Sequence, residues 1–274
     1  MMDASEVLRD TQLAFDSVAE DYDGTLGNNA LVQRIRARTL DAVMHKIPPG
    51  CKLLDLGCGT GLDAAYLAQA GYFVTAIDWS AEMVRRTKER IANAHLQNKA
   101  EVNHLGFHQL DEFQSGAFDG VYSNLGALNC AIRIEDVAVS LSKILKAEGK
   151  LIVSVIGRIC PWEWIYYSLK AQWRRANLRF QRGLVPVPLN GRTVWTRYYL
   201  PHEFQKVFEN AGFQLVSVRA LGLFVPPPYM IRFAESHTSM MEMLQGLDDR
   251  IGHWPILRNG GDHFLIVMQK YGRV

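Results

Sequence analysis

Two spacings of apolar residues alternate along the chain, and together they predict strands followed by helices. Short runs of apolar and β-branched residues are typical of buried strands, and they occupy residues 52–57, 72–78, 101–105, 118–123, 151–156, 213–218 and 264–268. Apolar residues at helical spacing lie at residues 31–40, 62–70, 81–94, 135–146 and 201–211. The alternation predicts an α/β fold: one seven-strand, mostly parallel sheet with helices on both faces and a late antiparallel hairpin.

Two stretches interrupt this alternation, and we expect them to form a cap over one edge of the sheet. The stretch 158–200 is rich in Trp and Tyr, and the stretch 222–260 holds three consecutive prolines and many methionines. The expected organisation is an N-terminal helical cover (1–50), a ligand-binding core (51–157), the aromatic cap insertion and a C-terminal part of the same sheet (201–274), which contains the second insertion.

Composition limits the class of protein. The chain has 274 residues, of which 48% are hydrophobic and 21% charged, so it has ample material for a folded core. Lys plus Arg number 30 and Asp plus Glu 28, and this balance gives no general reason to expect nucleic-acid binding. The polar N-terminus and the absence of a long apolar run lead us to expect a cytoplasmic protein without a membrane span. Neither the four cysteines nor the histidines have metal-ligand spacing, so no metal site is expected.

A glycine-rich turn is the most informative segment. Residues 57–61 (GCGTG) follow a predicted strand and precede a helix, a place where ligands approach the backbone closely. The next predicted strand ends in Asp78, whose carboxylate can accept hydrogen bonds from a ribose diol. The G-x-G-x-G spacing differs from the G-x-G-x-x-G of dinucleotide folds, and Asp55 would repel a pyrophosphate but attract an ammonium group. The turn therefore favours a nucleoside that bears an amino acid, and disfavours a nicotinamide dehydrogenase.

These motifs resemble the class I S-adenosylmethionine-dependent methyltransferases, which have a Rossmann-like sheet. LDLGCGTG (54–61) and AIDWSAEMV (76–84) match the first two motifs of that family, and residues 118–129 and 141–155 match its fourth strand, the end of the next helix and the fifth strand. The resemblance covers residues 50–157 well and 201–221 moderately. The lead-in AFDSVAEDYD resembles that of small-molecule members, including the ubiquinone/menaquinone and malonyl-carrier-protein types.

The resemblance implies S-adenosylmethionine as cofactor and a set of residues that bind it. The glycines of the turn would line the methionine and ribose, Asp55 would reach the ammonium, and Asp78 would bind the ribose hydroxyls. The full set is Tyr22, Asp55, Gly57, Cys58, Gly59, Gly61, Asp78, Trp79, Met83, Gly106, Phe107, His108, Asn124 and Leu125. Phe107 stands where many members have an Asp that bonds the adenine, so backbone groups would have to supply that contact. Tyr22, Trp79 and Met83 also fit plain packing, and Asp55 also fits a turn cap.

No motif identifies catalytic residues. Methyl transfer does not depend on such a motif, because a sulfonium methyl group is electrophilic before the protein acts. The candidate bases are Glu163, His108 and Tyr166. For the acceptor we expect an apolar pocket in the first insertion with a cation beside it, formed by Trp164, Tyr166, Tyr167 and Arg174. Two alternatives stay open for this segment: a solvated basic helix face, and contact of a basic amphipathic helix with a membrane surface.

The function implied by the resemblance is methyl transfer by in-line displacement to a small or carrier-bound, partly apolar acceptor. One alternative is a partner or regulatory protein that binds S-adenosylmethionine without catalysis. The other is an RNA or protein methyltransferase. Methylation of nucleic-acid base amino groups is disfavoured because residues 123–126 read SNLG, without the prolines and aromatic ring of an N-P-P-Y-like tetrapeptide. The acceptor atom, the acceptor molecule and the oligomeric state stay open.

Overall fold

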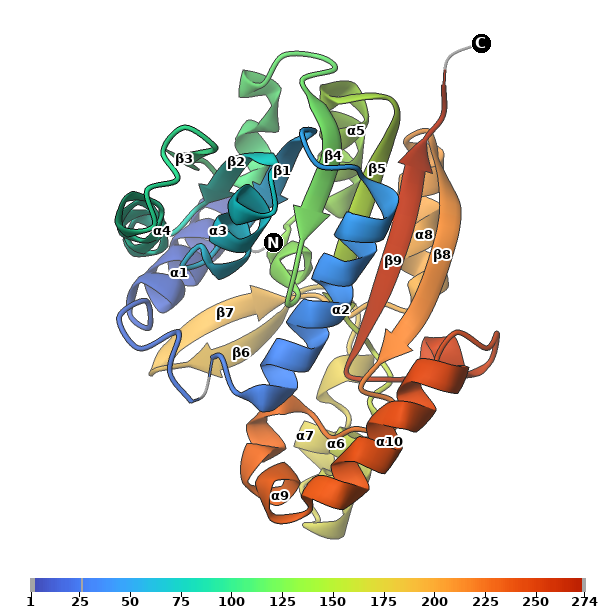
Figure 1. Cartoon of the computed structure of the whole chain (residues 1–274). Coiled ribbons are helices and arrows are strands. Elements are labelled where there is room, and N and C mark those ends of the chain that lie inside the picture. Colours follow the sequence, from blue (N-terminus) through green and yellow to red (C-terminus); the bar gives the residue numbers. More distant parts are fainter. Residues whose placement is uncertain (1–2, 26, 273–274) are drawn as a thin grey trace.

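The computed structural model describes residues 3–25 and 27–272, and its centre is a seven-stranded sheet (Figure 1). The strand order is β3-β2-β1-β4-β5-β9-β8. The strands are β1 (Lys52–Leu56), β2 (Phe73–Asp78), β3 (Ala100–His104), β4 (Phe118–Ser123), β5 (Leu145–Ile156), β8 (Phe213–Leu221) and β9 (His263–Lys270). Strands β1 to β5 pair in parallel, whereas β9 lies antiparallel between β5 and β8. The predicted seven-strand sheet with a late antiparallel hairpin is confirmed.

Helices cover both faces of this sheet, as the apolar spacing predicts. Helices α5 (Ile134–Ile144) and α8 (Pro201–Asn210) share one core cluster with the sheet, and α2 (Ala30–Lys46) and α3 (Leu62–Gln69) share the other. Helix α4 (Ala81–Asn93) packs against β3 and β2 at the sheet edge. The hydroxyl of Ser80 accepts the Met83 N–H at 3.1 Å, which is the N-cap that the sequence predicts. Short 3-10 turns are η1 (Phe107–Glu112), η2 (Ala127–Cys130), η3 (Leu178–Phe180), η4 (Pro228–Met230) and η5 (Leu257–Asn259).

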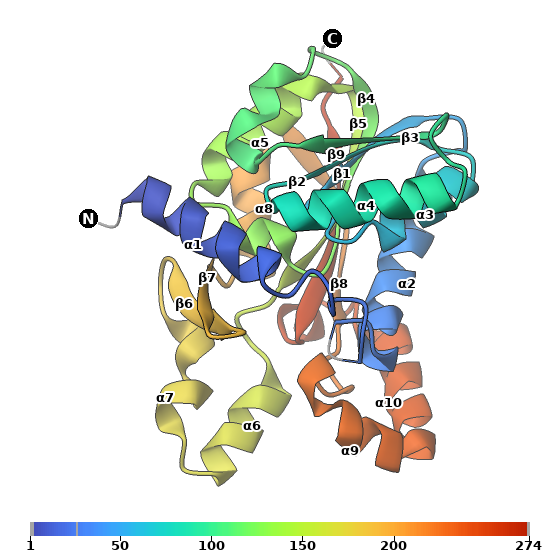
Figure 2. The same cartoon turned by 90° about the vertical axis from the view of Figure 1, so that its left-hand side faces the viewer.

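The cover over the carboxyl ends of the parallel strands differs from the expected cap. Helix α1 (Ala4–Asp16) lies against a two-stranded hairpin, β6 (Val185–Leu189) and β7 (Arg192–Thr196), which the sequence patterns did not predict. The helices α6 (Pro161–Leu169), α7 (Trp173–Ala176), α9 (Ile231–Ser236) and α10 (Thr238–Ile251) lie farther from the sheet, at the bottom of Figures 1 and 2. None of the helices in the described ranges is long and apolar enough to cross a bilayer.

Candidate functional site

The glycine turn after β1 is held to β2 by its own backbone. The N–H groups of Gly57 and Cys58 both donate to the Ile77 carbonyl at 2.9 Å. Gly57, Gly59 and Gly61 have φ angles of 80°, 56° and 78°, in the left-handed region that favours glycine. A Cβ at Gly57 would come within 2.5 Å of the Ala127 side chain, but one at Gly59 would meet only Tyr22, at 3.8 Å. The turn is therefore open at Gly59, where a ligand can approach the backbone.

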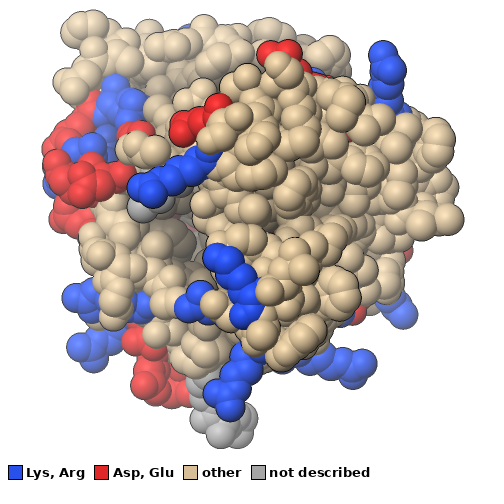
Figure 3. Space-filling model, turned by 90° about the horizontal axis from the view of Figure 1, so that it is seen from below, with Lys and Arg blue, Asp and Glu red and all other residues tan. Residues whose placement is uncertain are grey.

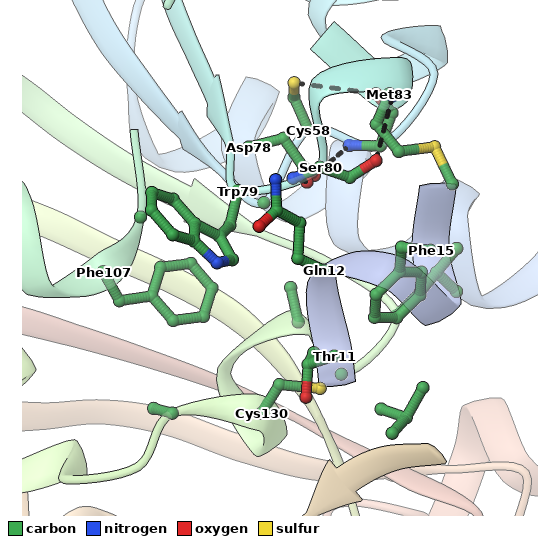
Figure 4. A pocket seen from close by; sticks show the side chains of 18 of the residues that line it. Thr11, Gln12, Phe15, Cys58, Asp78, Trp79, Ser80, Met83, Phe107 and Cys130 are labelled. Carbon is green, nitrogen blue, oxygen red and sulfur yellow. Dashed lines mark hydrogen bonds between the residues drawn. The ribbon is translucent and has the colours of Figure 1, made fainter. Parts of the chain in front are cut away.

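A cavity of about 490 Å³ lies beside this turn, at the carboxyl ends of β1, β2 and β4 (Figure 4). Ligands bind at this edge in open α/β sheets. Apart from Gly61, which faces Thr87, all the residues that we expected at the cofactor line this cavity. They are Tyr22, Asp55, Gly57, Cys58, Gly59, Asp78, Trp79, Met83, Gly106, Phe107, His108, Asn124 and Leu125. The fold thus brings the predicted set to one place, and their contact with a cofactor stays a prediction.

Asp78 combines a structural role with an open acceptor position. One carboxylate oxygen accepts the Gly59 N–H and the other accepts the Ser80 N–H, each at 2.9 Å. Burial raises the pKa of Asp78 even though these two donors favour the charged form. Each carboxylate oxygen has a further lone pair, so the group can still accept hydrogen bonds from a ligand that lies in the cavity.

Asp55 is almost completely buried, and its Oδ2 has no hydrogen-bond partner within the described chain. Burial, together with the nearby carboxylate of Asp63, raises its pKa well above the ordinary value. Arg36 of α2 lines the same cavity and forms an ion pair with Asp63 through one terminal nitrogen. The Nε of Arg36 is also buried without a partner in residues 3–25 and 27–272. Asp55 and Arg36, which both line the cavity, thus each keep one buried polar atom without a partner in the described ranges.

Asn124, expected beside the cofactor, is tied into the network that holds this wall. Its Nδ2 donates to the Tyr122 hydroxyl at 2.7 Å and to Asp63 at 3.2 Å, and its Oδ1 accepts from Ser154 at 2.6 Å. The Tyr122 hydroxyl in turn donates to Asp63 at 2.6 Å. These bonds fix the end of β4 against α3. The sequence patterns do not single out Arg36 and Asp63, because nothing distinguishes them from ordinary polar helix residues.

Aromatic rings form another part of the wall. Trp79 stacks on His104 at 5.4 Å and meets His108 edge-on at 4.8 Å. Figure 4 shows the rings of Trp79 and Phe107 side by side, with the amide of Gln12 from α1 nearby. The indole Nε1 of Trp79 is buried without a partner in the described chain. Gln12 supplies a polar group in this region, where the sequence has Phe107 in place of the usual acid.

The remainder of the cavity is mostly apolar and comes from elements distant in sequence. Its residues lie in α1, η2 and the loop after it, the end of β5 and strand β7, and they include Ala4, Val7, Leu8, Thr11, Cys130, Ala131, Ile132, Ile156, Val194 and Thr196. Burial raises the pKa of the Cys130 thiol to about 12, so it is a neutral wall group rather than a nucleophile. None of these residues belongs to a recognisable motif, and only long-range packing identifies them.

Hydrogen bonds to the start of α4 and to β7 hold helix α1 over the cavity. At its C-terminal end the Asp16 carboxylate accepts the Ser80 hydroxyl at 2.5 Å and the Glu82 N–H at 3.2 Å. Asp10 accepts the indole N–H of Trp195 in β7 at 3.0 Å. The cover therefore consists of α1 and the β6–β7 hairpin, and hydrogen bonds hold both to each other and to the core.

The residues that we expected to form the acceptor pocket lie elsewhere. Trp164, Tyr166, Tyr167 and Arg174 do not line the cavity. Trp164 and Arg174 are exposed, and Tyr166 and Tyr167 pack edge-to-face on each other at 5.2 Å. The reason is that α6 and α7 project beyond the sheet, whereas the β6–β7 hairpin of the same insertion occupies the position above the cavity.

The three candidate bases lie at different places in the structure. Glu163 is buried, forms an ion pair of 2.6 Å with Arg179 and does not line the cavity. Tyr166 accepts a hydrogen bond of 2.6 Å from Lys170 outside the cavity. His108 lines the cavity, at its aromatic wall. Of the three candidates it alone has access to a ligand there.

Comparison with known proteins agrees with this arrangement. Residues 54–153 match the family model described as a methyltransferase domain. YodH of Bacillus subtilis (strain 168), described as an uncharacterized methyltransferase, is 35% identical over 116 residues, which are 40% of this chain and 46% of that protein. The demethylmenaquinone methyltransferase of Beutenbergia cavernae is 32% identical over 153 residues, covering 54% of this chain and 58% of its own. The chain thus spans about half the length of these curated relatives.

Among solved structures, the fold is similar to that of the 1,6-didemethyltoxoflavin-N1-methyltransferase of Burkholderia thailandensis. The TM-score is 0.63 at 14% identity, and the match covers 99% of this chain and 92% of the other. At this identity the similarity shows the fold alone. It extends beyond the matched core to the N-terminal helices and both insertions.

Proposed function

Because residues 54–153 form a class I S-adenosylmethionine-dependent methyltransferase domain, we propose that the chain transfers the methyl group of S-adenosylmethionine to a small, partly apolar acceptor. The observation that carries the proposal is one cavity with two unlike ends. One end has buried carboxylates beside a glycine turn, and the other has apolar side chains of α1, β5 and β7. A charged nucleoside suits the first end, and an apolar molecule suits the second.

The polar groups of the inner end correspond to the charged groups of S-adenosylmethionine. Asp55 Oδ2 would accept from the methionine ammonium, and Arg36 Nε would donate to the methionine carboxylate. Both atoms are buried without a partner in the described chain, and burying such groups is unfavourable until a ligand satisfies them. Asp78 would accept from the ribose hydroxyls. These three residues together recognise an amino acid joined to a ribose rather than a dinucleotide.

The adenine would lie at the aromatic wall. Trp79 and Phe107 offer flat apolar surfaces there, and Met83 lines the cavity from α4. Gln12 carries an amide that can both donate and accept, so it can take the part of the acidic residue that Phe107 replaces.

The chemistry requires alignment more than acid–base groups. Bound S-adenosylmethionine supplies an electrophilic methyl group, and the chain's task is to hold the acceptor in line with it and to exclude water. Alignment supplies on the order of 7–11 kcal/mol in well-oriented systems. Helix α1 and the β6–β7 hairpin cover the cavity and limit the entry of water. His108 would serve as base for an acceptor that must lose a proton, with a contribution of roughly 10²–10⁴-fold.

The outer wall indicates the kind of acceptor. Val7, Ile156 and Val194 are apolar, while Thr11 and Thr196 add hydroxyls that can orient a polar group. This wall suits a ring or short chain with one polar substituent. The similarity to a demethylmenaquinone methyltransferase supports an acceptor with an apolar ring.

Ligand-induced stabilisation tests the cofactor half of the proposal. S-adenosylhomocysteine, S-adenosylmethionine and NADH are titrated in parallel while thermal unfolding is followed. A ligand at 100 times its dissociation constant raises the free energy of unfolding by about 2.7 kcal/mol. We expect a shift with both adenosyl ligands and none with NADH. A shift with NADH alone would contradict the proposal.

A matched pair of variants tests the acceptor half. Small phenols, quinols and carboxylic acids are screened for transfer of radiolabelled methyl from S-adenosylmethionine. Val194→Phe narrows the outer end, so we expect slower transfer with unchanged affinity for S-adenosylhomocysteine. Tyr166→Ala removes a ring outside the cavity, so both quantities should stay unchanged. If Tyr166→Ala slows transfer and Val194→Phe does not, the acceptor lies at α6 instead.

A further inference from the structure

Residues 164–182 of the first insertion form an exposed tip, and none of them lines the cavity. Large apolar side chains of this tip face solvent: Leu169 is 84% exposed, Trp173 59%, Ile165 51%, Trp164 47% and Phe180 46%. Ile165 and Leu169 are four residues apart in α6 and so lie on one helix face. So many exposed large side chains in one short segment mark an interaction surface.

The exposed charges of the tip are all positive. Lys170, Arg174, Arg175 and Arg182 are exposed, and none of the four forms an ion pair with a residue in the described ranges. The single acid between residues 158 and 200 is Glu163, which is buried and paired with Arg179. Figure 3 looks at the end of the molecule where α6 and α7 lie, and blue side chains stand around a broad tan surface there.

The tip is held firmly to the sheet. Arg179 donates to Glu163 at 2.6 Å, to the Asp262 carboxylate at 2.7 Å and to the carbonyls of Gly157 and Asp262 at 3.0 and 3.1 Å. The indole N–H of Trp162 donates to the Phe224 carbonyl at 2.7 Å. The inner face of α6 is thus bonded to the second insertion and to the start of β9, and its outer face stays exposed as a preformed surface.

We propose that this tip docks on an anionic lipid surface, with Ile165, Leu169 and Trp173 entering the interface and the four cations facing the headgroups. Charge complementarity requires a negatively charged partner. Tryptophan beside Lys and Arg is the composition of surfaces that lie at a membrane–water boundary. Helices α6 and α7 lie at one end of the molecule (Figures 1 and 2), and their large apolar side chains are exposed there. A fluid bilayer accommodates such side chains without a matching groove. This inference is independent of the proposed methyl transfer.

Vesicle co-sedimentation tests the inference with the full chain. One set of vesicles is phosphatidylcholine alone, and the other also contains phosphatidylglycerol. We expect the protein to pellet with the anionic vesicles, to remain in the supernatant with the neutral ones, and to be released by high salt. Pelleting with neither set, or equally with both, would overturn the inference. An acidic protein partner would be the occupant to test next.

Surface variants assign the effect to the tip. The double variant Leu169→Glu/Trp173→Glu should weaken binding to anionic vesicles by at least about tenfold, and Arg174→Gln/Arg175→Gln by a similar factor. Ile256→Glu is the matched control, because Ile256 is 85% exposed but follows α10 instead of lying in the tip. All of these side chains are exposed, so circular dichroism should show an unchanged fold. Equal loss in the Ile256→Glu control would also overturn the inference.

Discussion

Asp55 and Arg36, an acidic and a basic residue, line one cavity, and each keeps one buried polar atom that no residue of the described chain satisfies. Asp55 follows from the glycine-turn motif, whereas Arg36 comes from a helix that precedes the core in sequence. The ion pair of Arg36 with Asp63 fixes the guanidinium beside the turn. An amino-acid zwitterion would satisfy both atoms at once, and this makes the pair the most direct test of the cofactor site.

Loss of either charge should weaken binding of S-adenosylhomocysteine. Asp55→Asn removes the acceptor for the ammonium, and Arg36→Lys keeps a cation for Asp63 but removes the Nε donor. Hydrogen bonds to charged groups contribute about 1.5–3 kcal/mol, so the dissociation constant should rise roughly 10- to 100-fold in calorimetric titrations. Arg38→Lys is the control, because Arg38 lies on the same helix and pairs with Asp249 away from the cavity. Unchanged affinity of Arg36→Lys for S-adenosylhomocysteine would contradict the proposal that Arg36 binds the carboxylate of the ligand.

Asp55→Asn should also make the unliganded protein more stable at neutral pH. Burial raises the pKa of Asp55, so the folded state binds this proton more tightly than the unfolded state. The wild type therefore loses free energy of unfolding as the pH rises from about 4 through the folded-state pKa, and the variant does not. Thermal unfolding of both proteins from acid to neutral pH should show a margin in favour of the variant that grows with pH.

Asp119 provides a control of opposite sign for that experiment. Burial alone would raise its pKa, but hydrogen bonds from Lys146 and from the Lys52 N–H lower it. Its stabilising effect is present above the unfolded-state pKa and is lost as the pH falls through the folded-state pKa. Asp119→Asn should therefore lower the melting temperature at neutral pH. If both variants moved in the same direction, the charge argument for Asp55 would not hold.

Substitutions of the turn glycines should distinguish effects on folding stability from effects on ligand binding. Alanine at Gly59 has room but takes up a left-handed φ, which costs roughly 1–2 kcal/mol. Gly59→Val places a β-branched side chain at the same left-handed φ, so it should lose more stability than Gly59→Ala, and it should also lose stabilisation by S-adenosylhomocysteine because its side chain enters the cavity. A Cβ at Gly61 would lie 2.6 Å from Thr87, so Gly61→Ala should lose more stability than Gly59→Ala. Thermal melts with and without ligand measure both effects, and a normal ligand shift in Gly59→Val would contradict the close approach.

Replacing Arg179 should lower the free energy of unfolding far more than replacing an exposed basic residue of the same insertion. Arg179→Met leaves the buried carboxylates of Glu163 and Asp262 without their cation, which costs about 3–5 kcal/mol. Arg182→Met, at an exposed position, should change the free energy of unfolding by less than about 0.5 kcal/mol. Denaturant unfolding at neutral pH compares the two, and equal values would show that the cluster is not needed to hold the insertion.

The same cluster predicts an acid dependence. Although Asp262 is buried, Arg179 and His263 hold its pKa below the ordinary value. This contribution to stability is complete above the unfolded-state pKa, about 3.9, and is lost as the pH falls below it. Arg179→Met should therefore lose less stability than the wild type between neutral and acid pH. A parallel loss in both proteins would assign the acid sensitivity to other carboxylates.

The sheet and the glycine turn could be predicted because they depend on local pattern. The strand and helix periods, the Ser80 cap and the positive φ angles of the glycines are properties of short segments, and their order along the chain limits the topology. The start of the fifth strand differs from the prediction. Strand β5 begins at Leu145, six residues before the predicted start. Phe118 pairs with Leu145 and Gly120 with Lys150, so the register shifts and the polar stretch 146–149 is included in the strand.

The chain's sequence by itself determined the core fold and one end of the cavity, since the motif residues of that end lie at strand ends which the sheet topology brings together. Only the tertiary structure decided the rest. Arg36, Gln12 and Val194 reach the cavity from three elements outside the motifs, and the aromatic α6, expected at the acceptor, projects to the surface instead. Such contacts depend on how the α1 cover and the β6–β7 hairpin pack, and packing between distant segments leaves no periodic trace in the sequence.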